Sequence, residues 1–394
     1  MGSRRVKYMG NKSKMLPVLG EILSHYGKNS RKIADPFCGS ASVSWYLAEN
    51  TDKEIIAGDL QSFAARRAAA VVERTDVFDP TKIIENWFER AKTLVDAVAA
   101  HFPNHLRSIE PDLTDAAAIK KVVSQSRRFC EEVLPVVFND FEGPWQISKS
   151  YGGYYFSPTQ ALIFDALRKT LPSDAAKKKV ALAALIEACS RAAASPGHTA
   201  QPFQPTLSSA KYIIESWLRN PWDLTEAAVR DIAARSAVTA GISQIADFTK
   251  TLQLLEPGDL VFADPPYSGV HYSRFYHVLE TVSRGKEFVP EGNGRYPEIA
   301  QRPSSAFSKK SEAKAAARSL LEKCAEKSLH LVLTFPTVGA SNGLTAKDFT
   351  EMGGDLFSEI ETQEVMTDFS TLGGNKKHRA ARQATGESII TFVS

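Results

Sequence analysis

Three short apolar segments, each ending in or containing an aspartate, constrain the fold of this chain most strongly. They read RKIADPF at 31 to 37, EIIAGDL at 54 to 60 and GDLVFADPP at 258 to 266, and a fourth, LHLVLTF, covers 329 to 335. Continuous apolar runs of this length are typical of strands buried on both faces of a parallel sheet. Helical patterns after the first two segments would supply the crossovers that parallel strands need. The sequence therefore predicts an α/β fold with a doubly wound, mainly parallel sheet.

The middle of the chain follows a different pattern. Between 76 and 245, helical periodicity replaces the strand and helix alternation, and the clearest helical segments lie at 81 to 102, 115 to 138 and 177 to 194. We interpret 76–245 as a largely helical inserted domain, and 1–75 with 246–394 as the domain that holds the sheet. The closing segments FSEIETQEVM and ESIITFVS flank a basic loop that contains glycine, which predicts a terminal antiparallel hairpin.

Composition excludes some classes of protein and leaves others open. The 394 residues include 48 basic and 45 acidic side chains, so the net charge of +3 does not by itself indicate a nucleic-acid partner. No apolar run is long enough to span a bilayer, and the first residues lack the apolar centre of a signal peptide. We therefore expect a cytoplasmic protein with no membrane partner.

Four cysteines are scattered along the chain, at Cys38, Cys130, Cys189 and Cys324. None of them forms the C-x-x-C spacing of a thiolate zinc site, and the pattern does not suggest a disulfide framework. We expect reduced thiols and no structural metal.

The segment ADPFCGSASV at 34 to 43 predicts a ligand-binding turn between a strand and a helix. Asp35 ends the strand, and the small residues Gly39, Ser40 and Ala41 let the backbone approach a ligand closely. Asp59 ends the next strand, at about the distance where an acidic residue binds ribose hydroxyls in such folds. Because the turn lacks the G-x-G-x-x-G spacing, a cofactor with an adenosine and no phosphates fits better than a dinucleotide. An ordinary tight turn with a capping aspartate is the alternative.

The segment VFADPPYSGV at 261 to 270 predicts a holder for a flat heterocycle that carries an amino group. Pro265 and Pro266 cannot continue a strand ladder, so Asp264 should lie at the carboxyl end of its strand. The Asp264 carboxylate and the Pro265 carbonyl could accept hydrogen bonds from the amino group, while Tyr267 offers a stacking surface. A structural turn with two prolines is the alternative.

Candidate nucleic-acid contacts lie in three other segments. HYSRFYHVLE at 271 to 280 contributes Tyr272 and Arg274, SPGHTAQPF contributes His198 and Gln201, and the basic segment NKKHRAARQ contributes Lys376, Lys377 and Arg379. Each has a structural alternative: buried aromatic residues at a helix start, a solvated loop, and a solvated charged face.

Three motifs together carry a resemblance. KYMGNK at 7 to 12, DPFCGSASV at 35 to 43 and DPPY at 264 to 267 occur in the order found in the Dam-like (alpha-group) adenine-N6 DNA methyltransferases, which the chain resembles. The resemblance implies a Rossmann-like S-adenosylmethionine-dependent methyltransferase fold, S-adenosylmethionine as cofactor and double-stranded DNA as substrate. It also implies that the helical insertion recognises the DNA target.

The resemblance assigns roles to individual residues. Tyr8 and Lys12 would flank the methionine end of the cofactor, Asp59 would bind its ribose, and Asp247 would lie near its adenine. The full cofactor-binding set is Tyr8, Met9, Gly10, Lys12, Asp35, Pro36, Phe37, Cys38, Gly39, Ser40, Ala41, Asp59, Leu60, Asp247 and Phe248. The catalytic set is Asp264, Pro265, Pro266 and Tyr267. Ala41 stands where many members have a second glycine.

The leading hypothesis is a site-specific DNA methyltransferase that transfers a methyl group to N6 of an adenine flipped out of the duplex. Methylation of cytosine N4 or of an RNA base is one alternative, although aspartate at 264 favours adenine. A catalytically inactive DNA-recognition subunit is another, although the intact set of Lys12, Asp35, Asp59 and Asp264 argues against it. We expect a monomer, and a cognate restriction endonuclease or a defence-system subunit is a candidate partner.

Overall fold

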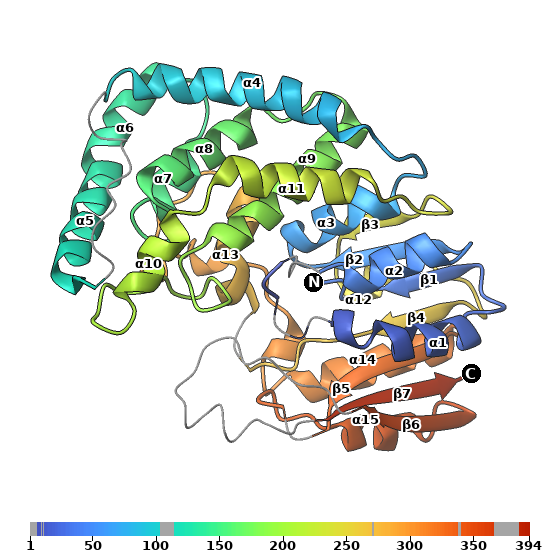
Figure 1. Ribbon diagram of the computed structural model, residues 1–394. Coiled ribbons are helices and arrows are strands. Elements are labelled where there is room, and N and C mark those ends of the chain that lie inside the picture. Colours follow the sequence, from blue (N-terminus) through green and yellow to red (C-terminus); the bar gives the residue numbers. More distant parts are fainter. Residues whose placement is uncertain are drawn as a thin grey trace. The chain divides into compact units, whose positions relative to one another are not determined.

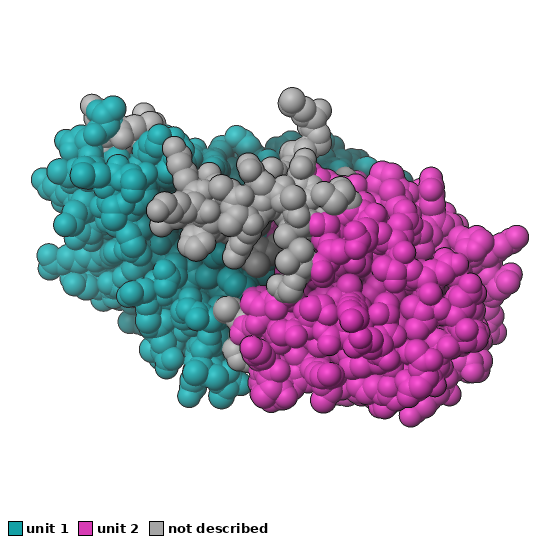
Figure 2. Space-filling view, turned by 90° about the horizontal axis from the view of Figure 1, so that it is seen from below, with its two compact units in different colours: residues 1–7, 77–234, 274–302 teal, residues 8–76, 235–273, 303–394 magenta. Residues whose placement is uncertain are grey.

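The computed structural model describes residues 6–8, 10, 12–102, 114–269, 272–337, 340–365 and 386–394. The chain divides into two compact units, which Figure 2 shows in different colours. We call them the sheet unit, formed by 8–76, 235–273 and 303–394, and the helical unit, formed by 1–7, 77–234 and 274–302. Each is described by itself below.

The sheet unit contains one mixed sheet, whose strands run in the order β3-β2-β1-β4-β5-β7-β6 (Figure 1). Within the described residues these strands are β1 (Lys32–Asp35), β2 (Glu54–Asp59), β3 (Ile242–Ile245), β4 (Leu260–Ala263), β5 (His330–Pro336), β6 (Glu359–Val365) and β7 (Glu387–Val393). The first five pair in parallel, and β7 pairs antiparallel with both β5 and β6. The predicted parallel sheet with a terminal antiparallel hairpin is confirmed.

Helices cover both faces of this sheet. They are α1 (Leu16–Tyr26), α2 (Ser42–Asn50), α3 (Ser62–Val72), α12 (Phe248–Leu252), α14 (Ala313–Glu326) and α15 (Ala346–Gly353), with the short turns η1 (Lys12–Lys14) and η5 (Ala306–Ser308). Alternate strand residues such as Val261 and Leu331 pack with Leu320 of α14 in one core cluster. Ile33 and Leu260, which point the other way, lie against the end of α1 at Gly27. Both faces of the central strands are buried, as the uninterrupted apolar runs predict, whereas the edge strands β3 and β6 are largely exposed.

The helical unit has its own apolar core. Its elements are α4 (Pro80–Ala99), α5 (Ala116–Arg128), the π-helical turn η2 (Phe129–Val133), α6 (Leu134–Val137), η3 (Phe138–Asp140), α7 (Gln146–Tyr151), α8 (Pro158–Lys169), α9 (Ala175–Ala192), α10 (Ala210–Trp217), α11 (Pro221–Ala233), most of α13 (Tyr272–Arg284) and η4 (Ile299–Gln301). The apolar stripe of α4 is buried, and the Trp87 indole N–H donates to the Leu167 carbonyl at 2.9 Å. Phe138 stacks on Trp145 with ring centroids 4.5 Å apart.

The bounds of the two compact units differ from those of the insertion predicted at 76–245. β3 at Ile242–Ile245 is an edge strand of the sheet, so the segment from 235 onward belongs to the sheet unit. Residues 274–302 lie in the helical unit although they follow the third predicted strand. The helix expected over 115–138 is instead divided into α5, η2, α6 and η3. Pro135 contributes to this division, because proline lacks the N–H that a continuous helix would use.

No helix in the described ranges is long and apolar enough to cross a lipid bilayer.

Candidate active site

Three aspartates meet at one edge of the sheet. Asp35 ends β1, Asp59 ends β2, and Asp264 directly follows β4. Because β1 pairs in parallel with both β2 and β4, the carboxyl ends of the three strands lie side by side. This edge is where open α/β sheets bind their ligands.

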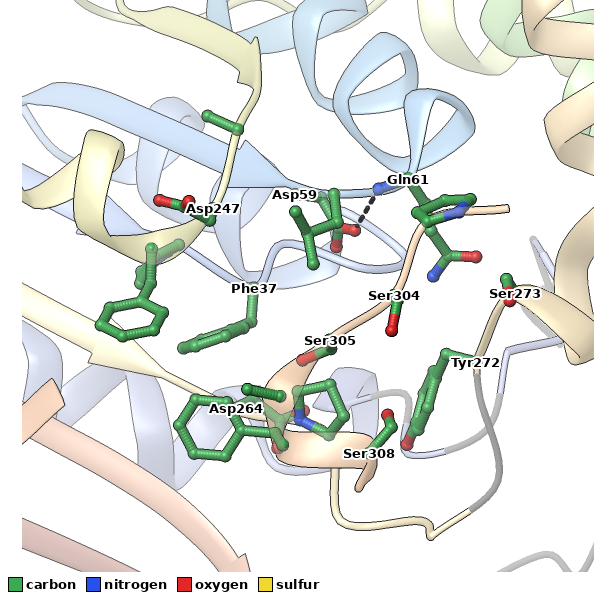
Figure 3. Close-up of a pocket in the computed structure, with 18 of the residues that line it drawn as sticks. Phe37, Asp59, Gln61, Asp247, Asp264, Tyr272, Ser273, Ser304, Ser305 and Ser308 are labelled. Atoms are coloured by element: carbon green, nitrogen blue, oxygen red, sulfur yellow. Dashed lines mark hydrogen bonds between the residues drawn. The ribbon is translucent and has the colours of Figure 1, made fainter. Parts of the chain in front are cut away.

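A cavity of about 290 Å³ opens at this edge, and all its lining residues belong to the sheet unit (Figure 3). The residues of the sequence prediction that line it are Tyr8, Pro36, Phe37, Asp59, Leu60, Asp247, Phe248, Asp264, Pro266, Tyr267 and Tyr272. Residues outside the prediction that line it are Gln61, Ala246, Thr249, Ser273, Pro303, Ser304, Ser305, Ala306, Phe307 and Ser308. The cavity therefore joins segments that are far apart in the sequence.

The three sequence motifs interlock around this cavity. Gly10 has φ of +75°, and a Cβ added there would lie 2.7 Å from the hydroxyl of Tyr267. Gly39 has φ of +47°, and a Cβ there would lie 2.7 Å from the hydroxyl of Tyr8. Both glycines are thus required by backbone conformation and by the close approach of an aromatic ring. The KYMGNK segment contacts both the DPFCG turn and the DPPY turn.

Asp264 is held through one of its two carboxylate oxygens. Lys12 Nζ lies 3.0 Å from Oδ1, and Thr334 Oγ1 donates a hydrogen bond to the same oxygen at 3.1 Å. No described residue bonds Oδ2. Burial raises the pKa of Asp264, while Lys12 and Thr334 act in the opposite direction. Asp264 thus lines the cavity with one carboxylate oxygen fixed and the other available as an acceptor.

Lys12 is buried between two carboxylates. Its ammonium contacts Asp264 Oδ1 and also donates to Glu387 Oε1. Burial opposes the charge on Lys12, but the two carboxylates outweigh it and raise the pKa of Lys12. Lys12 therefore stays protonated and bridges β7 to the segment that follows β4. The sequence prediction assigned Lys12 to the cofactor's methionine end, and this bridge is a contact that it did not include.

Asp35 is buried beneath the cavity and does not line it. Ser44 Oγ donates to Asp35 Oδ2 at 2.5 Å, and Asp35 Oδ1 has no hydrogen-bond partner among the described residues. Burial raises the pKa of Asp35 to about 7, an effect opposed by Ser44 and by the backbone N–H of Phe37 and reinforced by the charges of Asp264 and Asp59. A buried carboxylate oxygen without a partner is costly, which suggests a polar ligand group there.

The turn after β1 is fixed by Asp59. Asp59 Oδ2 accepts from the Gly39 N–H at 3.0 Å, and Oδ1 accepts from the Gln61 N–H at 2.8 Å. Ala41 follows with φ of +62°, a left-handed conformation that favours glycine. Ala41, which stands where many members of the resembled family have glycine, therefore adds backbone strain as well as a methyl group.

One end of the cavity is aromatic. Phe37 lies 6.0 Å from Phe248 and 5.4 Å from Phe307, measured between ring centroids. Asp247, beside them, caps α12 by accepting from the Lys250 N–H at 3.0 Å. Three rings and a carboxylate make a surface suited to a purine.

Asn342 connects two walls of the cavity, and the sequence prediction missed it. Its Nδ2 donates to the carbonyls of Pro266 and Phe307, each at 3.1 Å, and its backbone N–H donates to the Tyr267 carbonyl at 3.3 Å. Asn342 is only 1% exposed. The prediction also missed Glu387, Thr334, Phe307 and Gln61. Among these, only Gln61 had a local signal, because it follows the strand-end Asp59-Leu60 pair.

Other predicted residues lie away from the cavity lining or outside the described residues. Gly10, Lys12, Asp35, Cys38, Gly39, Ser40, Ala41 and Pro265 belong to the segments that form its walls without lining it. Met9, Lys376, Lys377 and Arg379 lie outside the described residues. Of the DNA-contact candidates, Tyr272 lines the cavity, with its ring centroid 6.5 Å from that of Tyr267.

The remaining DNA-contact candidates gather in the helical unit. Tyr296 donates through its hydroxyl to the Ala200 carbonyl and accepts from Arg274 Nη2 at 3.4 Å. The His198 ring lies 4.8 Å from that of Phe275. The loop that carries His198 and Gln201 therefore lies beside the segment that carries Arg274. Gln201 and Arg274 are exposed, whereas His198 is partly buried and burial lowers its pKa.

The family model for D12 class N6 adenine-specific DNA methyltransferases matches residues 8–107 and 136–331. A search of individual curated proteins gives no significant match. The family match covers most of the chain, including the DPFCG and DPPY motifs and all of the KYMGNK motif except its first residue, Lys7. The chain belongs to the D12 class N6 adenine-specific DNA methyltransferases.

Proposed function

We propose that this methyltransferase uses S-adenosylmethionine to methylate N6 of an adenine that has been flipped out of double-stranded DNA. Asp264 carries the proposal. It lines an aromatic cavity, its Oδ1 is held by Lys12 and Thr334, and Oδ2 is left to accept a hydrogen bond from an amino group. An adenine in the base stack could not reach such a recessed carboxylate, which supports flipping.

The residues around the cavity fit the cofactor. Asp35 Oδ1, Gln61 Oε1 and Ser308 Oγ are buried polar atoms without partners among the described residues, and a ligand with several polar groups could satisfy them. The rings of Phe37, Phe248 and Phe307 suit an adenine, and Asp59 lies where ribose hydroxyls would be bound. When bound, S-adenosylmethionine would supply a methyl group activated by its sulfonium.

The chain's own residues would orient the target amino group. The N6 lone pair is delocalised into the adenine ring, and a hydrogen bond from N6–H to Asp264 would draw the nitrogen towards a more nucleophilic geometry. Tyr267 would stack on the base, a contact worth roughly 1–3 kcal/mol. Asp264 would also receive or relay the proton that N6 must lose. Positioning of this kind can supply on the order of 7–11 kcal/mol of a barrier.

We propose that the helical unit recognises the DNA target. The exposed Arg274 and Gln201, together with partly buried His198, form one cluster with Tyr296, and such groups contact phosphates and base edges. A monomeric state, a cytoplasmic location and an associated endonuclease or defence-system subunit stay predictions from the sequence.

The test is direct. The purified chain is incubated with unmethylated duplex DNA and S-adenosylmethionine carrying a labelled methyl group, and the DNA is digested to nucleosides and analysed by mass spectrometry. We expect the labelled methyl group to be recovered in N6-methyldeoxyadenosine. Label in N4-methylcytosine, or label only in RNA substrates, would contradict the proposal. Binding of the cofactor alone is measured separately by calorimetry.

A further inference from the structure

Glu387 is a buried carboxylate to which the proposed function assigns no role. It lies at the first residue of β7 and is 2% exposed. Its Oε1 accepts a hydrogen bond from Lys12, whose ammonium also contacts Asp264. One ammonium therefore bridges two carboxylates in a part of the sheet unit where water screens charges weakly.

The sheet register explains how Glu387 reaches this position. β7 pairs antiparallel with β5, and Glu387 lies opposite Pro336, two residues from Thr334. Thr334 donates directly to Asp264, and Glu387 contacts Lys12, so the same end of this strand pair supports Asp264 in two ways. The closing hairpin of the chain thus contributes to a site that also draws on η1, on β5 and on the segment after β4.

The negative charge of Glu387 is what a neutral hydrogen-bond acceptor at this position would lack. A glutamine at this position could also accept a hydrogen bond from Lys12. Lys12 would then be paired with Asp264 alone, and the pair would be neutral. With Glu387, one ammonium is shared between two carboxylates, and the cluster is left with a net negative charge when all three groups are ionised. Burying a second charge is costly, so a neutral acceptor would be the simpler way to hold Lys12.

We propose that Glu387 is a positioning residue that holds the Lys12 ammonium and shares its charge, so that Asp264 keeps the acceptor strength needed for the adenine amino group. This inference rests on the proposed function of Asp264. Glu387 would act through Lys12 and would not touch the substrate.

The inference has a consequence for the pH dependence of the reaction. The titratable groups facing Asp264 are Lys12 from η1, Glu387 from β7, Asp35 from β1 and Tyr267 from its own segment. Burial raises the pKa of Glu387, opposed by Lys12 and reinforced by the negative charge of Asp264. The same repulsion acts on Asp264 when Glu387 is charged. Removing the charge of Glu387 should therefore lower the pKa of Asp264.

The experiment compares Glu387→Gln, Glu387→Asp and a control, Glu364→Gln, with the wild type. Glu364 is an exposed carboxylate on the same hairpin. Both kcat and kcat/KM for duplex DNA are measured with saturating S-adenosylmethionine, from about pH 5 to about pH 9. The acid limb of kcat/KM reports ionisation of an essential base in the free enzyme. Thermal melting of each variant checks folding.

We expect Glu387→Gln to lower kcat at its optimum by about ten-fold and to move the acid limb to lower pH. Glu387→Asp should keep the wild-type acid limb with a smaller loss of kcat, and Glu364→Gln should match the wild type. A loss of kcat that is the same at every pH would show a packing role and overturn the inference. A pH–rate profile of Glu387→Gln that matches the wild-type profile would overturn the inference as well.

A second comparison keeps the inference testable if Glu387→Gln does not fold. Lys12→Met should move the acid limb to higher pH, because two buried carboxylates then repel each other. The double variant Lys12→Met/Glu387→Gln removes the repulsion between residue 387 and Asp264 and should bring the limb back to lower pH. Identical limbs in the two variants would contradict coupling between Glu387 and Asp264. A wild type without adenine methylation would contradict the proposed function instead.

Discussion

The ammonium of Lys12 lies 3.0 Å from Oδ1 of Asp264, and this contact joins the first motif of the chain to the third. Thr334 donates to the same oxygen at 3.1 Å. Two donors therefore hold one oxygen of Asp264, whereas Oδ2 accepts no hydrogen bond from the described residues. Under the proposed function, this second oxygen would accept from the target amino group.

Asp264→Asn should lower the single-turnover rate of methylation by about 10³-fold or more. The asparagine oxygen would turn towards Lys12 and Thr334, so the NH₂ group, a donor, would face the substrate amino group. Rapid-quench measurement of labelled methyl transfer checks the rate, and calorimetry checks that cofactor binding is retained. Thr334→Val, which removes one donor and keeps the carboxylate, should cost only about ten-fold. Turnover close to wild type in Asp264→Asn would contradict the role of Asp264.

Asp35→Asn should stabilise the cofactor-free protein at high pH and weaken cofactor binding. The folded-state pKa of Asp35 is raised to about 7 from 3.8, so ionisation of this buried group opposes folding as pH rises. The gain in the free energy of unfolding should be a few kcal/mol above pH 7 and should vanish as pH falls towards 4. Urea unfolding at several pH values measures it. A gain that does not change with pH would contradict this origin.

Ala41→Gly should raise the free energy of unfolding by up to about 1 kcal/mol. Ala41 has φ of +62°, a conformation that costs an alanine roughly 1–2 kcal/mol, and glycine removes this strain from the folded state. Glycine also makes the unfolded chain more flexible, which offsets part of the stabilisation. Ala48→Gly, in the interior of α2, is the matched control and should destabilise by about 1 kcal/mol. Equal losses from both substitutions would show that Ala41 carries no backbone strain.

Asn342→Ala should destabilise the sheet unit by about 1–3 kcal/mol and lower kcat. The substitution leaves the carbonyls of Pro266 and Phe307 without the donor that now joins them. Asn50→Ala provides a control, since Asn50 is exposed and bonds only the Tyr46 carbonyl of its own helix. Chemical unfolding and steady-state rates measure both effects. A variant with normal kcat would show that Asn342 supports stability without affecting the activity proposed for the turn at 264–267.

Local sequence patterns were sufficient to predict the centre of the fold and much of the cavity. Asp35, Asp59 and Asp264 each follow a buried apolar run, and parallel pairing brings such strand ends together. The edge strand β3 was missed because its sequence, ISQI, is short and half polar, and an edge strand needs fewer apolar residues. Nothing in the local sequence of residues 274–302 predicts that they belong to the helical unit.

Long-range partners explain what the sequence did not reveal about the site. Glu387 and Asn342 act through contacts with Lys12 and Pro266, residues far from them in the chain. Neither lies in a segment with unusual composition, and a glutamate that begins a strand is ordinary. The sheet register places Glu387 near the site, and Asn342 is placed by the loop that follows β5. Glu387 and Asn342 differ from most polar residues of the chain in being almost fully buried. The residues next to a single polar side chain in the sequence do not predict that it will be buried.

Arg274→Ala should weaken binding to duplex DNA and reduce its salt dependence, because the proposed cluster in the helical unit contacts phosphate. Removing one phosphate contact should lower the slope of log K against log salt by about 1. Tyr296→Phe removes the hydroxyl between Arg274 and the Ala200 carbonyl but keeps the charge, so it should weaken binding without changing that slope. Arg230→Ala is the control, since Arg230 is exposed in the same unit and paired with Glu226. Fluorescence anisotropy at several salt concentrations compares the three, and equal slopes for Arg274→Ala and the wild type would argue against a phosphate contact at Arg274.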